Sequence, residues 1–197
     1  MALIFRVLNS TSGEFSHWCC GCAALYVDKK HQSKIHSLAP SGGFGKGFNA
    51  EFMFKGLKDY SPFLALHTAL DFWLALGPSN IRAYITELAH NAGTMLADRW
   101  ETDTLFPISM YGPMVLIRLP DRLWNHSGTT IATKPIADHI QDLLHYDYGI
   151  EVPVKPIKGR LYVRISAHVY NHMRDYHVLA DAVCLLVEKV DIGNDTS

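Results

Sequence analysis

Residues 161–171 of this chain, Leu-Tyr-Val-Arg-Ile-Ser-Ala-His-Val-Tyr-Asn, place one arginine inside an otherwise apolar, β-branched run. The run predicts a strand, and Arg164 lies near its middle. A guanidinium keeps its charge inside a protein, so burying it is costly unless an anion lies close by. The sequence leaves two partners open: an Asp or Glu of the same chain in a structural ion pair, or the carboxylate of a small-molecule substrate.

The composition is that of a folded protein. The chain has 197 residues, of which 48% are apolar and 19% charged, so it can form one large or two small domains. Its net charge of −1 gives no reason to expect nucleic acid or an acidic membrane as a partner. We recognise neither a signal peptide nor an apolar run long enough to cross a membrane. Three of the four cysteines crowd at Cys19, Cys20 and Cys22, which is not a disulfide framework, so we expect a cytoplasmic location.

The N-terminal half predicts strands, a loop and two helices. Residues 22–27 read as a buried strand, and the glycine-rich residues 41–47 as a flexible loop that lacks the Ser or Thr of a nucleotide-binding Walker loop. Ser61-Pro62 is a typical helix start, and the apolar run that follows to residue 74 predicts an interior helix. A second, long helix is predicted over 79–100.

The C-terminal half predicts a small α/β unit. We expect strands at 114–119, 150–154 and 161–166, a helix over 133–146, and a last helix capped by Asn171. This order favours a mostly antiparallel sheet. The predicted domains are residues 1–104 with the long helix as a connector, residues 105–190, and a polar tail at 191–197.

The other polar residues do not predict a metal site or a catalytic nucleophile. The cluster that runs from His17 to Cys22 lacks the paired spacing of zinc ligands, so no metal is expected, and no base identifies a cysteine nucleophile. Of the eleven histidines only His17 and His168 lie in suggestive settings. Tyr170-Asn171 is interpreted as a structural pair that closes the strand.

The segment from Arg164 to Tyr176 resembles the C-terminal signature of the class V pyridoxal-phosphate aminotransferases. That group includes cysteine desulfurases, plant cysteine desulfhydrases and isopenicillin N epimerase-like proteins. Its pattern is Arg-Ile/Ala-Ser, a short spacer, Tyr-Asn, and a helix that begins near an acidic residue, which is Asp175 here. The resemblance implies that Arg164 binds the α-carboxylate of an amino-acid substrate.

Further motifs extend the resemblance, in particular to the epimerase-like and desulfhydrase-like branch, from about residue 16 to 190. They are Gly45-Lys46-Gly47-Phe48, Glu51-Phe52, the segment 59–63, Phe72-Trp73, Leu76-Gly77, Ile81-Arg82-Ala83-Tyr84, Met114-Val115 and Leu119-Pro120. The fold implied is α/β, the C-terminal part of a fold-type I pyridoxal-phosphate (PLP) dependent transferase: a remnant of the large domain, a long connecting helix and a small α/β domain. The family implies PLP as cofactor and a dimer as the assembly.

Two positions depart from the family pattern. Aligning Trp18 with the family His-Lys-Trp turn puts His17 where the family has the lysine that forms the Schiff base. Lys29 and Lys30 are expected at a solvated strand end, where they do not replace it. At Gly56-Leu57 the family has Gly-Thr, whose hydroxyl contacts the cofactor phosphate of the neighbouring subunit. We therefore expect no catalytic residue and doubtful binding of PLP by this chain.

Three hypotheses follow. The first is a truncated, degenerate member of the superfamily without turnover of its own, in which Arg164 survives. The second is an incomplete gene model of an active PLP-dependent lyase or epimerase acting on an amino acid, which transcript reads upstream of the start codon would reveal. The third is a noncatalytic protein that pairs with a full-length relative. We expect the first part to expose an apolar face when alone and residues 105–190 to fold by themselves.

Overall fold

The computed structural model describes residues 26–53, 56, 59–125 and 131–195. For residues 191–195 it describes only the helical backbone. The chain divides into two compact units, Met1–Leu76 and Gly77–Ser197. The second unit begins upstream of the boundary predicted near residue 105, because the long helix packs with the sheet that follows it.

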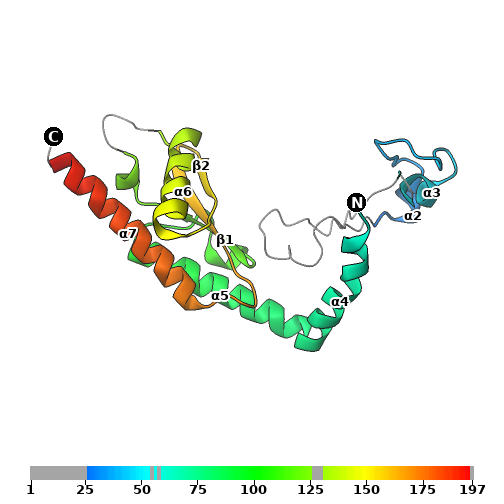
Figure 1. Cartoon of the computed structure of the whole chain (residues 1–197), viewed down its shortest axis with the longest axis horizontal. Helices are drawn as coiled ribbons and strands as arrows, with labels where there is room; N and C mark the ends of the chain where they lie inside the picture. Colours follow the sequence, from blue (N-terminus) through cyan, green and yellow to red (C-terminus); the bar gives the residue numbers. More distant parts are fainter. Residues whose placement is uncertain (1–25, 54–55, 57–58, 126–130, 196–197) are drawn as a thin grey trace. The chain divides into compact units, whose positions relative to one another are not determined.

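The first unit contains three described helices: α2 (Lys29–Gln32), α3 (Phe48–Met53) and α4 (Ser61–Leu76), drawn in blue to cyan-green in Figure 1. The strand predicted at 22–27 is wrong where the structure describes it, since Tyr26 and Val27 belong to no strand. Val27 is nevertheless buried, and its carbonyl accepts a hydrogen bond from Gln32 Nε2 at 2.9 Å. Asp28 then caps α2 by accepting from the Lys30 N–H, so a helix begins where the strand was expected to end.

The glycine-rich loop is held in place by one buried acid. Glu51 on α3 is 3% exposed, and its carboxylate accepts from the Gly45 N–H at 3.1 Å and contacts His36 Nδ1 at 2.9 Å. The His36 hydrogen bond, more than any other contact, keeps the pKa of Glu51 below its usual value. Gly43 packs so tightly that a Cβ there would lie 2.2 Å from the Ala50 carbonyl oxygen. The loop is thus a packed structural turn, not the flexible segment that its composition predicted.

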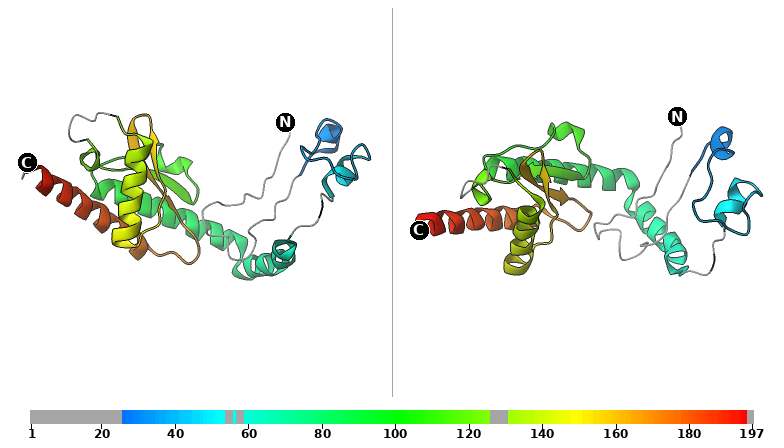
Figure 2. Two further views of the ribbon diagram at one scale, coloured as in Figure 1. Left: turned by 45° about the horizontal axis from the view of Figure 1, so that its top comes forward. Right: turned by 90° about the horizontal axis from the view of Figure 1, so that it is seen from above.

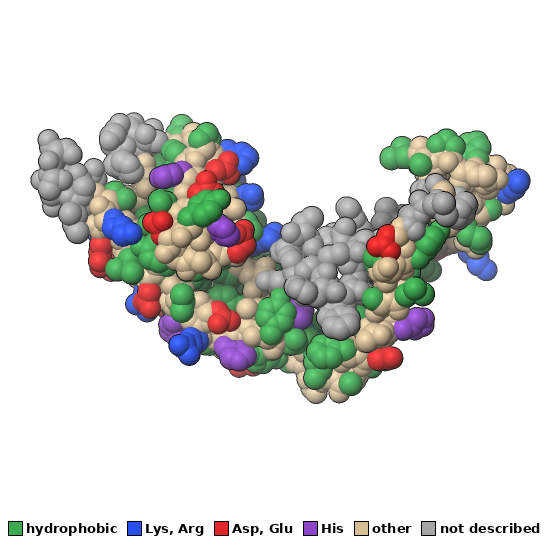
Figure 3. All heavy atoms as spheres, in the orientation of Figure 1, with side chains coloured by type: hydrophobic (Ala, Val, Ile, Leu, Met, Phe, Trp, Pro, Cys, Tyr) green, Lys and Arg blue, Asp and Glu red, His purple; other side chains and the backbone are tan. Residues whose placement is uncertain are grey.

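Helix α4 is rich in apolar residues but has no buried residue. It begins at Ser61 and ends before Gly77-Pro78 as predicted, and the Asp59 carboxylate accepts from the Ser61 N–H at 2.9 Å. The prediction that it is interior is wrong, because none of its residues is buried. Leu64 is 77% and Leu74 67% exposed, and Figure 3 shows hydrophobic side chains along the surface of this helix. A helix this rich in apolar side chains normally buries them, whereas α4 buries none of its residues.

The second unit is built on a three-stranded antiparallel sheet of order β1-β3-β2, as the sequence predicted. The strands are β1 (Met114–Arg118), β2 (Val154–Ile157) and β3 (Arg160–Ser166). One face of the sheet is the core, and its side chains are at most 1% exposed: Val115, Ile117, Val154, Leu161, Val163 and Ile165. Period-2 alternation sends the residues between them to the opposite face.

Helices cover the core face. They are α5 (Pro78–Arg99), which lies along β1 and against α7 (Met173–Asp195), and α6 (Lys134–Tyr148), which packs against β2 (Figures 1 and 2). Two short 3-10 turns, η1 (Ile108–Met110) and η2 (Asp121–Leu123), flank β1. Gly93 lets α5 approach closely, because a Cβ there would lie 3.0 Å from Val115 Cγ1. Among the described segments, no helix is both long and apolar enough to cross a bilayer.

Two secondary-structure elements have other bounds than the sequence predicts. The strand expected at 150–154 lies at Val154–Ile157 instead, because the two-residue turn at Lys158-Gly159 makes the residues just before it pair with β3. The last helix runs to Asp195 through Gly193, into the predicted polar tail. Its start is also different: the Asp175 carboxylate, not Asn171, accepts from the backbone N–H of His172 at 3.0 Å.

Candidate carboxylate-binding site

Arg164 lies on the central strand β3, on the face opposite the core. Its cross-strand neighbour on β1 is Leu116, and its own backbone N–H donates to the Pro153 carbonyl at 3.0 Å. Tyr162 and Ser166 share its face along the strand. Because both neighbouring strands hold the backbone of β3, the Arg164 side chain starts from a fixed point, half-buried in the sheet surface.

Arg164 has no anion beside it in the part of the chain that the structure describes. Its Nε is buried without a hydrogen-bond partner, and no carboxylate lies within ion-pair distance of its guanidinium. An unsatisfied buried donor costs about 1–3 kcal/mol. The structural ion pair that the sequence left open is therefore not formed by the described acids.

A second arginine on the same face shows what an ion pair in this sheet looks like. Arg118 on β1 lies opposite Tyr162, and its side chain is 17% exposed. Its Nε lies 3.1 Å from Asp103 Oδ1, and its Nη1 lies 3.3 Å from Asp121 Oδ2. Two carboxylates thus neutralise Arg118, whereas Arg164, diagonal to it on the adjacent strand and on the same sheet face, has neither.

The other residues of the 164–176 motif fix the connection from β3 to α7. The Tyr176 hydroxyl donates to the Ser166 carbonyl at 3.0 Å, and Asn171 Oδ1 accepts from the His168 N–H at 3.0 Å. Asn171 also donates through Nδ2 to Asp175 at 3.3 Å. These bonds satisfy backbone groups at a strand end and a helix start. The structural interpretation of Asn171 fits them, although its partners are not those of a helix cap.

His168 belongs to the same connection. Its ring stacks on Tyr170 with centroids 4.5 Å apart, and burial lowers the pKa of its imidazole below the usual 6.5. The neutral form is therefore favoured near pH 7. A neutral imidazole adds no positive charge to this connection.

The cofactor side of the predicted site lies largely outside the described residues. This holds for His17, for Leu57, and for Cys19, Cys20 and Cys22. Gly56 is described, with φ of +109° and open space around it. Within the described ranges, no three His, Cys, Asp or Glu side chains gather as metal ligands would.

The residues matched to the PLP site do not fit covalent attachment of this cofactor. The imidazole of His17 has no primary amine to condense with an aldehyde. Lys29 and Lys30 are exposed on α2, and Lys30 Nζ lies 3.3 Å from Asp28 Oδ2. The described residues thus supply a candidate clamp for a carboxylate, and the residues aligned with the family lysine and its neighbours supply no amine placed for a Schiff base.

Comparison with known proteins agrees with the motifs. No model of a known protein family matches the chain. The L-cysteine desulfhydrase of Arabidopsis thaliana is 30% identical over 190 residues, which cover 87% of this chain and 40% of that protein. The isopenicillin N epimerase of Streptomyces clavuligerus is 34% identical over 131 residues, which cover 66% of this chain and 30% of that protein. The chain belongs to the class V pyridoxal-phosphate aminotransferase superfamily. Its relatives place it in the desulfhydrase-like and epimerase-like branch.

The fold agrees with this assignment. The structure of Oryza sativa TDC with PLP and tryptamine matches 87% of this chain and 33% of that chain, with a TM-score of 0.50 and 14% identity. The predicted fold class, part of a fold-type I PLP-dependent transferase, is confirmed. The chain spans about two fifths of the length of the curated relatives that it matches.

Replacing Tyr176 with Phe removes the hydroxyl that donates to Ser166 O and leaves that carbonyl short of a partner. We expect Tyr176→Phe to lower the free energy of unfolding by about 1 kcal/mol, measured by urea denaturation of the full chain. Tyr146→Phe is the matched control. Because Tyr146 is 79% exposed, this substitution should change the free energy of unfolding by about 0.5 kcal/mol at most. Equal effects of the two substitutions would show that the Tyr176 bond does not hold the motif together.

Proposed function

We propose that this chain binds the carboxylate of an amino acid through Arg164 and carries out no PLP-dependent turnover by itself. The observation that supports carboxylate binding is the contrast between Arg118 and Arg164, which lie on one sheet face. Arg118 is neutralised by Asp103 and Asp121, whereas Arg164 has a buried Nε with no partner and no described acid beside it.

The physical reason is the geometry of the guanidinium. Its planar N–H groups match the two oxygens of a carboxylate, and such charge-assisted pairs are about twice as strong as neutral hydrogen bonds. Arg164 starts from a strand that is hydrogen-bonded on both sides, so it loses little freedom when it binds. A ligand carboxylate would also supply the partner that the fold itself leaves out.

The relatives suggest which amino acid to try. Several are named as L-cysteine desulfhydrases, one of them chloroplastic and others putative. We therefore propose L-cysteine as the first ligand to examine. A cytoplasmic location for this chain remains part of the proposal.

Carboxylate binding can be measured by following amide signals of the labelled full chain by NMR. L-cysteine under reducing conditions should shift signals of β3 saturably, whereas cysteamine, the same molecule without the carboxylate, should not. Arg164→Gln should weaken binding about tenfold or more, the loss of at least one charge-assisted hydrogen bond. Arg174→Gln is the control, because Arg174 is exposed on α7. Equal binding of cysteamine, or unchanged binding in Arg164→Gln, contradicts the role of Arg164.

The absence of turnover follows from the missing amine and has its own test. With added PLP we expect no absorbance band of a protein-bound Schiff base, and no single lysine labelled after borohydride reduction, as read by mass spectrometry. A stable adduct on one lysine, together with elimination from L-cysteine, would instead favour the alternative in which the sequence is a piece of an active lyase or epimerase.

A second candidate function rests on helix α4. Its exposed apolar side chains favour a noncatalytic protein that pairs with a full-length relative through the first unit. A tagged full chain should then co-purify with such a relative from the source cells, and a variant with Leu64→Glu and Leu74→Glu should not. Co-purification that survives both substitutions would exclude α4 as the contact surface.

A further inference from the structure

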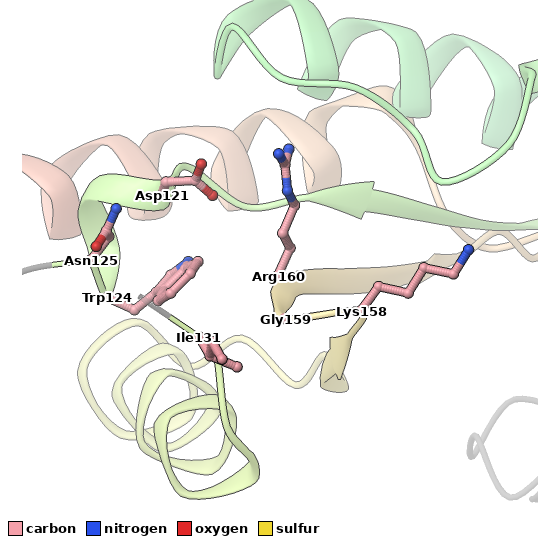
Figure 4. A pocket seen from close by; sticks show the side chains of 7 residues that line it. All are labelled: Asp121, Trp124, Asn125, Ile131, Lys158, Gly159 and Arg160. Atoms are coloured by element: carbon pink, nitrogen blue, oxygen red, sulfur yellow. The ribbon is translucent and has the colours of Figure 1, made fainter. Parts of the chain in front are cut away.

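A cavity of about 420 Å³ lies at the end of β3 away from Arg164 (Figure 4). One wall consists of Asp121, Trp124 and Asn125 with Ile131, and the other of the turn at residues 158–160. Arg160 opens β3 four residues before Arg164, about 13 Å along an extended strand. The cavity is therefore separate from the candidate carboxylate site, and nothing in the comparisons assigns it a role.

The turn that forms one wall is rigid. Ile157 pairs with Arg160, so Lys158 and Gly159 make a two-residue hairpin loop, and their φ angles are +49° and +78°. This left-handed backbone at both positions is that of the primed turns that suit twisted hairpins. The Gly159 carbonyl accepts from the Ala132 N–H at 3.0 Å, which ties the turn to the segment beside Ile131. The wall thus holds its shape without a ligand.

The cavity carries cationic groups that have no counter-ion of their own. Lys158 and Arg160 are exposed and form no ion pair with any acid that the structure describes. Asp121 is the one acid on the wall, and its Oδ2 is already engaged by Arg118 at 3.3 Å. In Figure 4 the Arg160 side chain lies on the same side of the turn as Asp121 and Trp124. The Lys158 side chain points away from them. Arg160 is thus the main cation of this site.

Two buried polar atoms beside these cations also lack partners. Trp124 is 4% exposed, and its indole Nε1 has no hydrogen-bond acceptor. Asp121 Oδ1 is buried and has no donor. Figure 4 shows the indole nitrogen on the ring edge that faces Asp121 and Arg160. Buried N–H and carboxylate groups are normally bonded to protein or ligand, so a missing donor and a missing acceptor at one cavity point to an absent molecule.

We propose that this cavity binds a small oxyanion, a carboxylate or a phosphate, that also carries a hydroxyl or ammonium group. Arg160 and the Trp124 N–H donate to the oxyanion, and Asp121 Oδ1 accepts from the hydroxyl or ammonium. Ile131 and the face of the indole bound the apolar part of the molecule. Both buried atoms have almost no solvent-accessible surface, so contact requires the Trp124 and Asp121 side chains to turn toward the cavity.

The test follows the indole N–H signals of the full chain, labelled with nitrogen-15, by NMR. The four tryptophans give four such signals, and the one lost in Trp124→Phe is that of Trp124. The probes are inorganic phosphate, acetate and glycolate, the last being acetate with an added hydroxyl, all at constant ionic strength. We expect a saturable shift of the Trp124 signal. If the natural ligand is a carboxylate, the shift should be larger with glycolate than with acetate. If the natural ligand is a phosphate, only inorganic phosphate should cause the shift.

Substitutions of exposed residues decide the outcome without unfolding the protein. Arg160→Gln should weaken binding about tenfold, and Lys158→Asn, which keeps a residue that tolerates positive φ, should weaken it less. Arg174→Gln is the matched loss of charge elsewhere and should change nothing. No saturable shift with any of the three probes, or an equal loss in Arg160→Gln and Arg174→Gln, overturns the proposal. Arg164→Gln should leave this site unchanged, so failure here is distinct from failure of the proposed function.

Discussion

The pairing of β3 with both of its neighbours is the constraint on which the rest of the structure depends. Antiparallel partners on each side fix the register, and the register decides which face each side chain takes. Val163 and Ile165 go into the core under the helices, so Arg164 must go to the other face. A slip of one residue would bury the guanidinium in the core and expose both aliphatic side chains. The hydrophobic effect that folds this unit thus also sets the position of Arg164.

Electrostatics then distinguishes two arginines that the sheet treats alike. Arg118 and Arg164 occupy the same face of adjacent strands, but Asp103 and Asp121 both contact Arg118. Asp103 is held there by its backbone, because its carbonyl accepts from the Arg118 N–H at 2.9 Å. The arrangement keeps these two carboxylates near β1. Arg164 is left half-buried, with no described carboxylate beside its guanidinium.

The sequence predicts the architecture well where a pattern of side chains decides it, and less well where backbone geometry does. The apolar runs at 114–119 and 161–166 located β1 and β3, and the charge inside the second run identified Arg164 as exceptional. The position of β2 depends on the turn at Lys158-Gly159, and its Pro156 at a sheet edge hides the strand from a propensity argument. The role of Glu51 was not found, although an acid between Ala50 and Phe52 in an apolar helix is a signal for a buried, bonded carboxylate. His17 and Leu57 lie outside the described residues, so the cofactor side of the prediction rests on the resemblance.

The two halves of the family chemistry make different demands on a chain, so clamping a carboxylate does not require a tether for the cofactor. Clamping a carboxylate needs one guanidinium on a well-paired strand, and the compact unit from Gly77 onward supplies that framework with its own core. Tethering PLP needs a lysine amine, phosphate contacts and a closed large domain around them. In this chain the residue aligned with the family lysine is His17, and α4 exposes apolar side chains. A missing tether would therefore cost the sheet nothing, whereas loss of the β3 register would disrupt the core and move the proposed clamp.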